Sequence, residues 1–279
     1  MLPAIDSHHH FWTYNRAEYG WIDDSMEILK REYLPEELKE ECSRAGISGT
    51  VAVQARQSLE ETAWLLSLAE SAPWIKGVVG WLDLRSVELG TQLDRYAPHP
   101  KLVGIRHVLQ DEPDRNFMLQ PPFLNGIAQL EPHHLAYDIL IQHEQLDQAA
   151  RLVSGFPGQK FVLDHLGKPP IREGGLQPWR RKLEQLADHP NVWCKISGMV
   201  TEADHRHWTY EGLLPYLDAA VEAFGTERIM VGSDWPVCRL AAEYTEVISI
   251  PRRYFSKWSS GDQQKVFYQN AIDCYELEV

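Results

Sequence analysis

Eight short runs of hydrophobic residues recur along the chain, separated by longer stretches in which polar and hydrophobic positions mix. Most of these runs are continuously hydrophobic and do not alternate with polar residues, which is typical of strands buried on both faces of a parallel sheet. The pattern predicts strands in residues 2–6, 50–55, 75–84, 101–109, 135–141, 159–165, 191–197 and 228–234.

Helical spacing of hydrophobic residues appears between several of these runs. Ser58 with Glu61 three residues later, and Ser260 with Gln263, have the spacing of a capping box at a helix start. Gly225 is a suitable helix stop. The spacing predicts helices in residues 58–71, 145–156, 213–225 and 260–277.

Eight strands alternating with helices in 279 residues predict a (β/α)8 TIM barrel, a fold whose typical length is about 250 residues. No Pro-, Gly- or Ser-rich linker divides the chain, so we expect a single domain over residues 1–279. The rival fold is a doubly wound open sheet, which usually has a glycine-rich turn after its first strand. Histidines stand there instead, which favours the barrel.

The first connection, residues 11–33, is long, rich in aromatic residues and without a clear period. Long loops without secondary structure of their own usually serve a binding or catalytic site. We therefore predict that residues 11–33 form an active-site loop.

Composition narrows the classes of function. The net charge is −13 without a basic block, which disfavours nucleic acid and anionic membranes as partners. No hydrophobic run approaches the ~20 residues that span a bilayer, and no signal-peptide pattern opens the sequence. The four cysteines are widely spaced and are expected to be reduced, buried thiols of a cytoplasmic protein. The sequence leaves open whether the protein is a monomer or a homodimer.

Candidate chemistry begins with the stretch IDSHHHFW at residues 5–12. Three histidines within a hydrophobic context are too few for a purification tag and suit the end of a buried strand. Because side chains alternate along a strand, His8 and His10 point to one side and His9 to the other. Two imidazoles on one side can hold one metal ion or one substrate.

Polar residues also stand at the carboxyl ends of the other predicted strands, where barrel enzymes place their active sites. Any one of them has an ordinary explanation: Asp234 could cap a helix, and His165 could be a loop histidine. However, imidazoles end the first and sixth strands and a carboxylate ends the eighth, and the first and eighth strands are neighbours once a barrel closes. These end residues are Asp6, His8, His10, Gln54, Arg56, Asp83, Arg106, His107, Gln142, His143, Asp164, His165, Lys168, Lys195, Ser197, Ser233, Asp234 and Trp235.

Three motifs carry a resemblance to a known family: D-x-H-x-H-F-W at residues 6–12, V-L-D-H-L-G-K-P at 162–169 and G-S-D-W-P at 232–236. Together they resemble the amidohydrolase superfamily. Within it, the chain is similar to the branch of sugar-lactone hydrolases that includes L-fuconolactonase and L-rhamnonolactonase. The similarity runs through nearly the whole chain, including GIRHVLQ, YDILI and KISG.

The resemblance implies metal ligands from the first, sixth and eighth strands, which here are His8, His10, His165 and Asp234. Two-metal members also use a carboxylated lysine or a glutamate near strand 4 and a histidine ending strand 5. This chain offers Arg106 and His107 near strand 4, and Gln142 at the end of strand 5. We therefore expect one divalent ion, with zinc favoured by the ligand types. Members of this branch that work without a metal leave open whether the ion is essential.

The implied activity is hydrolysis of a sugar (aldono) lactone to its aldonic acid by water attack at the carbonyl. Asp234 is the expected base, and His8, His10 and His165 either hold the ion or donate to the carbonyl oxygen. Asp6 and Asp164 are expected to fix histidine tautomers. The expected substrate contacts are Arg106, His107, Trp12, Trp81, Trp235, Gln54 and Lys168.

Two alternatives remain at this stage. One keeps the superfamily and changes the reaction to a metal-dependent decarboxylation or to hydrolysis of an amide or a dicarboxylate lactone. The D-x-H-x-H motif followed by Phe-Trp favours the lactonase over the decarboxylase, whose motif usually begins with glutamate. The other alternative is a non-catalytic sugar-binding protein. The identity and ring size of the lactone stay open.

Overall fold

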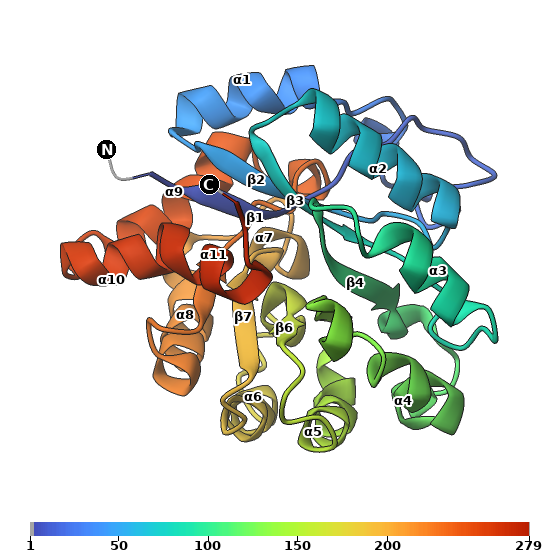
Figure 1. Ribbon diagram of the computed structural model, residues 1–279. Helices are drawn as coiled ribbons and strands as arrows, with labels where there is room; N and C mark the ends of the chain where they lie inside the picture. The colour runs from blue at the N-terminus through green and yellow to red at the C-terminus, as the bar shows by residue number, and fades with distance from the viewer. Residues whose placement is uncertain (1–2, 279) are drawn as a thin grey trace.

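The computed structural model describes residues 3–278, and within that range eight parallel strands pair in chain order to form a barrel (Figure 1). All eight predicted strands are confirmed, although Leu2, in the first of them, lies outside the described residues. The strands are buried along almost their whole length, as continuous hydrophobic runs predict. They are β1 (Ile5–His9), β2 (Gly49–Val53), β3 (Ile75–Gly80), β4 (Leu102–Val108), β5 (Ala136–Leu140), β6 (Phe161–Leu163), β7 (Val192–Ile196) and β8 (Ile229–Val231).

The barrel closes where β1 meets β8, and this seam uses individual hydrogen bonds in place of a regular ladder. The Asp234 amide donates to the His8 carbonyl at 2.8 Å, and the His10 amide donates to the Trp235 carbonyl at 2.6 Å. The Ser7 hydroxyl donates to the Val231 carbonyl at 2.8 Å. These bonds join the first and last strands, so the open-sheet alternative is excluded.

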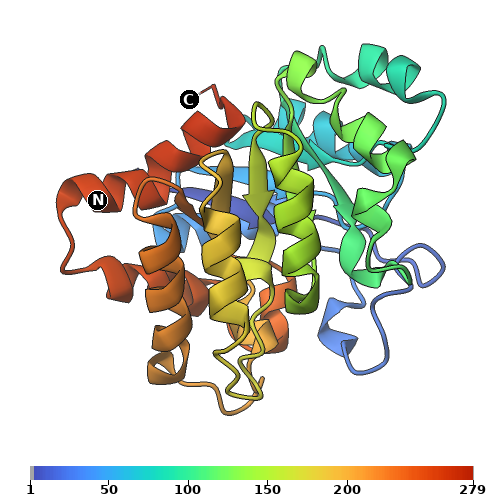
Figure 2. The ribbon, with the colours of Figure 1, turned by 90° about the horizontal axis from the view of Figure 1, so that it is seen from below.

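Helices surround the strands (Figures 1 and 2). The C-terminal helix α11 (Asn270–Tyr275) packs Ala271, Cys274 and Tyr275 against the hydrophobic side chains inside the barrel. The other α-helices are α1 (Pro35–Ala45), α2 (Leu59–Ser71), α3 (Leu89–Tyr96), α4 (Pro121–Ile127), α5 (Leu146–Ser154), α6 (Trp179–Ala187), α7 (Met199–Glu202), α8 (Tyr210–Phe224), α9 (Tyr244–Phe255) and α10 (Ser260–Gln264).

Two helix starts differ from the predicted capping boxes. Ser58 accepts a bond from the Glu61 amide at 3.1 Å, but the Glu61 carboxylate does not return to Ser58. It accepts instead from the amides of Ala55 and Arg56, at 3.0 and 2.9 Å. The final helix begins one residue early, because the side chain that caps it belongs to Ser259 and not Ser260. A π-helical turn over residues 265–269 then separates α10 from α11.

Residues 11–33 form a loop whose two ends are held together. The Trp12 and Tyr33 backbones exchange hydrogen bonds of 3.1 and 2.9 Å, and the one regular element inside is the 3-10 turn Glu27–Leu29. All four cysteines are buried and unpaired, as predicted. Among residues 3–278, no helix combines the length and hydrophobicity that crossing a membrane requires.

Candidate active site

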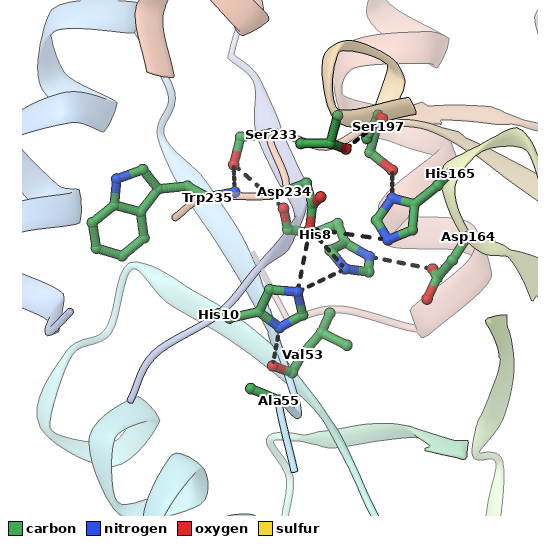
Figure 3. A network of polar contacts seen from close by, with 12 residues as sticks. His8, His10, Val53, Ala55, Asp164, His165, Ser197, Ser233, Asp234 and Trp235 are labelled. Atoms are coloured by element: carbon green, nitrogen blue, oxygen red, sulfur yellow. Dashed lines mark hydrogen bonds and ion pairs between the residues drawn. The ribbon is translucent and has the colours of Figure 1, made fainter. Parts of the chain in front are cut away.

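Three imidazoles and one carboxylate converge at one end of the barrel (Figure 3). The Oδ1 atom of Asp234 lies 3.3 Å from Nε2 of His10, 3.8 Å from Nε2 of His8 and 3.9 Å from Nε2 of His165. The Nε2 atoms of His8 and His10 are 3.2 Å apart. His9 points the other way and contacts the Thr50 hydroxyl at 2.9 Å, as strand alternation predicts.

These spacings fit a single tetrahedral metal ion. Ligand bonds of about 2.0–2.1 Å place two ligands of a tetrahedral zinc ion about 3.3 Å apart. Nε2 of His8 and Nε2 of His10 are 3.2 Å apart, and Oδ1 of Asp234 lies 3.3–3.9 Å from the Nε2 atoms of the three imidazoles. His8, His10 and Asp234 meet the spacing of a metal-binding group. The donor atoms present therefore suit a divalent ion.

The Nδ1 atoms of His10 and His165, which point away from Asp234, each contact a hydrogen-bonding partner. Nδ1 of His10 lies 2.8 Å from the Val53 carbonyl oxygen, which can only accept a hydrogen bond. The His10 proton is therefore on Nδ1, and Nε2 keeps its lone pair for the cluster. Nδ1 of His165 lies 2.8 Å from the Ser197 hydroxyl, which fixes that ring from its far side.

His8 is oriented by a buried carboxylate. Its Nδ1 atom lies 3.2 Å from Oδ1 of Asp164 and 3.1 Å from Nζ of Lys195. The Lys195 ammonium is engaged by two carboxylates, at 2.5 Å from Asp138 and 3.0 Å from Asp164. A proton on His8 Nδ1 therefore faces Asp164, and Nε2 is left to bind a metal, as a carboxylate–histidine pair requires.

This buried charge network was only partly visible in the sequence. Lys195 and Asp164 stand at strand ends, but Asp138 lies inside the hydrophobic run of β5. Burial raises the pKa of Asp138 to about 6, against the opposing effect of Lys195. The Tyr275 hydroxyl donates to Asp138 at 2.8 Å. Asp138, a charged residue within a hydrophobic strand, was the one feature of the sequence that could have indicated a charge network inside the barrel.

Asp164 also explains why one ion fits better than two. His8, Asp164 and His165 form a second group with metal-like spacing. However, Nη1 of Arg106 donates to Asp164 at 3.0 Å, and Lys195 contacts its other oxygen. Two cations therefore already neutralise this carboxylate.

The expectation that Asp6 fixes a histidine ring is wrong. Its carboxylate accepts from the Ser233 amide at 2.8 Å, the Ser233 hydroxyl at 2.6 Å and the Tyr244 hydroxyl at 3.0 Å. It also accepts from the backbone amide of His8 at 3.1 Å. The Asp6 side chain faces the seam and not the cluster. Its hydrogen bonds therefore hold β1 against the segment that follows β8.

The surroundings of His165 and Asp234 hold both groups in the protonation states that bind a metal ion. Burial lowers the pKa of His165 to about 4, so its ring is neutral at pH 7. Burial would raise the pKa of Asp234, but its interactions with His165 and His10 outweigh burial and hold that pKa below its ordinary value. Neutral imidazoles beside an ionised carboxylate are the forms that bind metal.

The backbone is left-handed at both motifs that follow β6 and β8. His165, Leu166, Gly167 and Lys168 have consecutive positive φ angles of 53°, 56°, 66° and 51°, and Asp234 has a φ of 58°. Left-handed non-glycine residues cost about 1–2 kcal/mol each and persist where the surroundings impose them, often at functional sites. The Trp179 indole helps by donating to the Leu166 carbonyl at 2.9 Å.

A cavity of about 650 Å³ opens onto the cluster. Its lining includes His10, His165 and Asp234, together with Arg106 and Lys168. The loop 11–33 forms part of the wall through Glu18, Gly20, Trp21 and Met26. Glu202 and His205, from the segment after β7, also line the cavity and were not identified from the sequence.

Of the expected substrate contacts, Arg106 and Lys168 line the cavity, and the other five do not. Trp12 and Trp235 are fully buried, and the Trp12 indole donates to the Leu29 and Arg31 carbonyls. The side chains of Gln54, Trp81 and His107 are held by hydrogen bonds within the protein. The Gln54 amide donates to the Arg106 carbonyl, the Trp81 indole donates to His107, and His107 pairs with Glu112. An aromatic residue at a strand end can fill the core between barrel and loop, and Trp21 is the tryptophan that reaches the cavity.

The barrel, the ligand cluster at its strand ends and the motifs that carry them define the class of this protein. The amidohydrolase family model matches residues 5–277, so the chain belongs to the amidohydrolase family.

Close relatives share almost the full length. The L-fucono-1,5-lactonase of Burkholderia multivorans is 42% identical over 284 residues, covering 98% of this chain and 96% of its own. The L-fucono-1,5-lactonase of Burkholderia ambifaria is 35% identical over 244 residues, covering 88% of this chain and 84% of its own. A crystal structure of a Burkholderia multivorans amidohydrolase with bound zinc has a TM-score of 0.96 and 41% identity, covering 99% of both chains. The family, the ligand cluster and this neighbour together support a divalent metal ion in the site.

Proposed function

We propose that the protein hydrolyses a sugar 1,5-lactone to the corresponding aldonic acid, with one zinc ion held by His8, His10, His165 and Asp234. The observation that carries the proposal is the convergence of three imidazoles and one ionised carboxylate beside a cavity, with the Nε2 atoms of His8, His10 and His165 lying 3.3–3.9 Å from Oδ1 of Asp234. Two full-length relatives named L-fucono-1,5-lactonase favour this reaction over decarboxylation.

When bound, a divalent ion supplies positive charge that polarises the lactone carbonyl. Asp234 lies at the cavity wall and is ionised, so its carboxylate can take the proton from the attacking water. Addition of the water oxygen to the carbonyl carbon opens the C=O π bond. The C=O bond then re-forms as the ring C–O bond breaks, and Asp234 returns the proton to the departing ring oxygen.

Arg106 has two parts in this scheme. Its Nη1 atom lies 3.0 Å from Asp164 and 3.4 Å from Nε2 of His8, and its side chain lines the cavity. The guanidinium therefore keeps Asp164 beside His8, and it offers positive charge to the carboxylate product. Lys168 contributes a second cation at the wall.

The test is proton release from a panel of 1,4- and 1,5-aldonolactones at neutral pH, corrected for spontaneous hydrolysis, with elemental analysis of the same sample. We expect at least one 1,5-lactone, with L-fucono-1,5-lactone first in the panel, to open far faster than its background. Failure of the metal-loaded protein to accelerate any lactone would overturn the proposal, and carbon dioxide release from an aromatic acid would favour the decarboxylase alternative. The cytoplasmic location, the absence of nucleic-acid and membrane partners and the monomeric or homodimeric state stay predictions.

A further inference from the structure

Glu202 is a half-buried carboxylate on the cavity wall, and the proposed reaction gives it no part. It is the last residue of α7, its side chain is 24% exposed, and it lines the cavity beside Lys168. Burial raises the pKa of Glu202, against the opposing effect of Lys168. A carboxylate placed this way is stabilised when hydrogen-bond donors reach it.

The hydrogen-bonding capacity of this carboxylate is largely unused. Within residues 3–278, its one ion-pair or hydrogen-bond partner is Nζ of Lys168, at 3.5 Å from Oε1. Two other carboxylates of the cavity wall are engaged more closely: Glu18 pairs with Arg56 at 2.7 Å, and Glu112 pairs with His107 at 2.7 Å. Glu202 and Lys168 therefore face the cavity with acceptors and donors to spare.

The backbone fixes this pair relative to the metal-ligand cluster. Lys168 ends the left-handed turn that begins at His165, and its amide donates to the His165 carbonyl at 2.8 Å. Residues three apart in so tight a turn lie on the same side, so Lys168 and His165 both face the cavity. The Glu202 amide donates to the Gly198 carbonyl at 3.2 Å, directly after Ser197, which holds His165.

We propose that Lys168 and Glu202 form a hydroxyl-recognition pair, which makes the enzyme selective for lactones that carry adjacent ring hydroxyl groups. One hydroxyl can donate to the carboxylate and accept from the ammonium at once, and its neighbour can fill the second carboxylate oxygen. A lactone without hydroxyls leaves both charges unsatisfied, which disfavours its binding. This inference rests on the proposed lactonase activity and names the substrate feature that the site selects.

The experiment measures kcat/KM for the best sugar 1,5-lactone and for δ-valerolactone, which has the same ring without hydroxyls. We define the selectivity ratio as kcat/KM for the sugar lactone divided by kcat/KM for δ-valerolactone. We expect Glu202→Gln to lower this ratio at least ~10-fold, mainly by raising KM for the sugar lactone. Lys168→Met should lower the ratio similarly. The double variant should lose less than the product of the single losses, because the two side chains act on the same hydroxyls. If δ-valerolactone is not turned over, its inhibition constant as a competitor replaces its kcat/KM.

Glu36→Gln is the matched control, since Glu36 is an exposed carboxylate on α1, away from the cavity wall, and its ratio should equal that of the wild type. A wild-type ratio in both Glu202→Gln and Lys168→Met would overturn the inference, as would an equal fall on both lactones. If one variant fails to fold, as judged by circular dichroism and metal content, the other decides. A wild-type protein that opens no lactone at all would instead refute the proposed function.

Discussion

The Nε2 atom of His10, near the start of the chain, lies 3.3 Å from Oδ1 of Asp234, near its end. The backbone brings them together, because the amides of Asp234 and His10 bond across the seam between β1 and β8 at 2.8 and 2.6 Å. Closure of the barrel and assembly of the histidine–aspartate cluster are therefore the same structural event. A site fixed by strands keeps its ligands in place more accurately than one built on mobile loops.

Replacing Asp234 by asparagine should lower kcat on the best lactone at least ~10²-fold, because the amide cannot accept the proton from water. Elemental analysis of the same sample separates two causes. If the variant keeps its metal and loses turnover, Asp234 acts as the base. If it loses both metal and turnover, Asp234 acts as a metal ligand. Asp94→Asn, at an exposed position of α3, is the matched control and should behave like the wild type. Unchanged turnover in Asp234→Asn would remove Asp234 from the mechanism.

Replacing Asp164 by asparagine should weaken metal binding about 10–100-fold, because it removes the carboxylate that holds His8 by its Nδ1 atom. The measurement is a zinc dissociation constant from competition with a chelator, at a temperature where circular dichroism shows the variant folded. Asp147→Asn removes a carboxylate that pairs with Lys182 on the surface, and should leave zinc affinity unchanged. Equal zinc affinity in Asp164→Asn and wild type would show that His8 is oriented without this carboxylate.

Strand positions and most strand-end residues could be predicted from the sequence, because burial on both faces leaves a local signal that does not depend on the partner strand. The convergence of His8, His10, His165 and Asp234 could be predicted because the carboxyl ends of all strands meet at one rim. By contrast, the contact of Tyr275 with Asp138 joins the C-terminal helix to the fifth strand, and no local pattern encodes it.

Side-chain direction within loops was the other limit. Trp12 and Trp235 follow strands that carry ligands, but their indoles fill the core beneath the loop 11–33. Glu61 has capping-box spacing, yet two backbone amides of the preceding loop compete successfully for its carboxylate. Such competition between local and tertiary partners is decided by packing, which the spacing of residue types does not contain.

Replacing Gly198 by alanine should destabilise the protein and displace His165. Gly198 has a φ of 66°, and an added Cβ would lie 2.7 Å from Nδ1 of His165, inside its contact with Ser197. A left-handed alanine costs about 1 kcal/mol or more, and the clash adds to that cost. We expect a lower Tm together with weaker zinc binding.

Gly90→Ala is the matched control for this change. Gly90 lies in α3, and a Cβ there would meet nothing within 4 Å. Alanine is favoured over glycine in a helix by about 0.5–1 kcal/mol, so the Tm should rise and zinc affinity should stay constant. A Gly198→Ala protein with wild-type Tm and zinc affinity would contradict the close approach of this glycine to His165.

Glu61 should make stability fall as pH rises through neutrality. Burial raises the pKa of Glu61 from its ordinary 4.5 to about 7, although the amides of Arg56 and Ala55 oppose the shift. Between these two values the folded protein binds more protons than the unfolded chain, so the free energy of unfolding decreases with increasing pH. The contribution is complete below about pH 4.5 and is lost as the pH passes about 7.

Glu61→Gln carries no titrating group, so its Tm should change less between pH 5 and pH 8 than that of the wild type. Other buried carboxyls, such as Asp6, titrate in both proteins, and the comparison cancels them. Glu60→Gln, at the adjacent exposed position, should keep the wild-type slope. Parallel curves for wild type and Glu61→Gln would show that the Glu61 carboxyl titrates alike in the folded and unfolded protein.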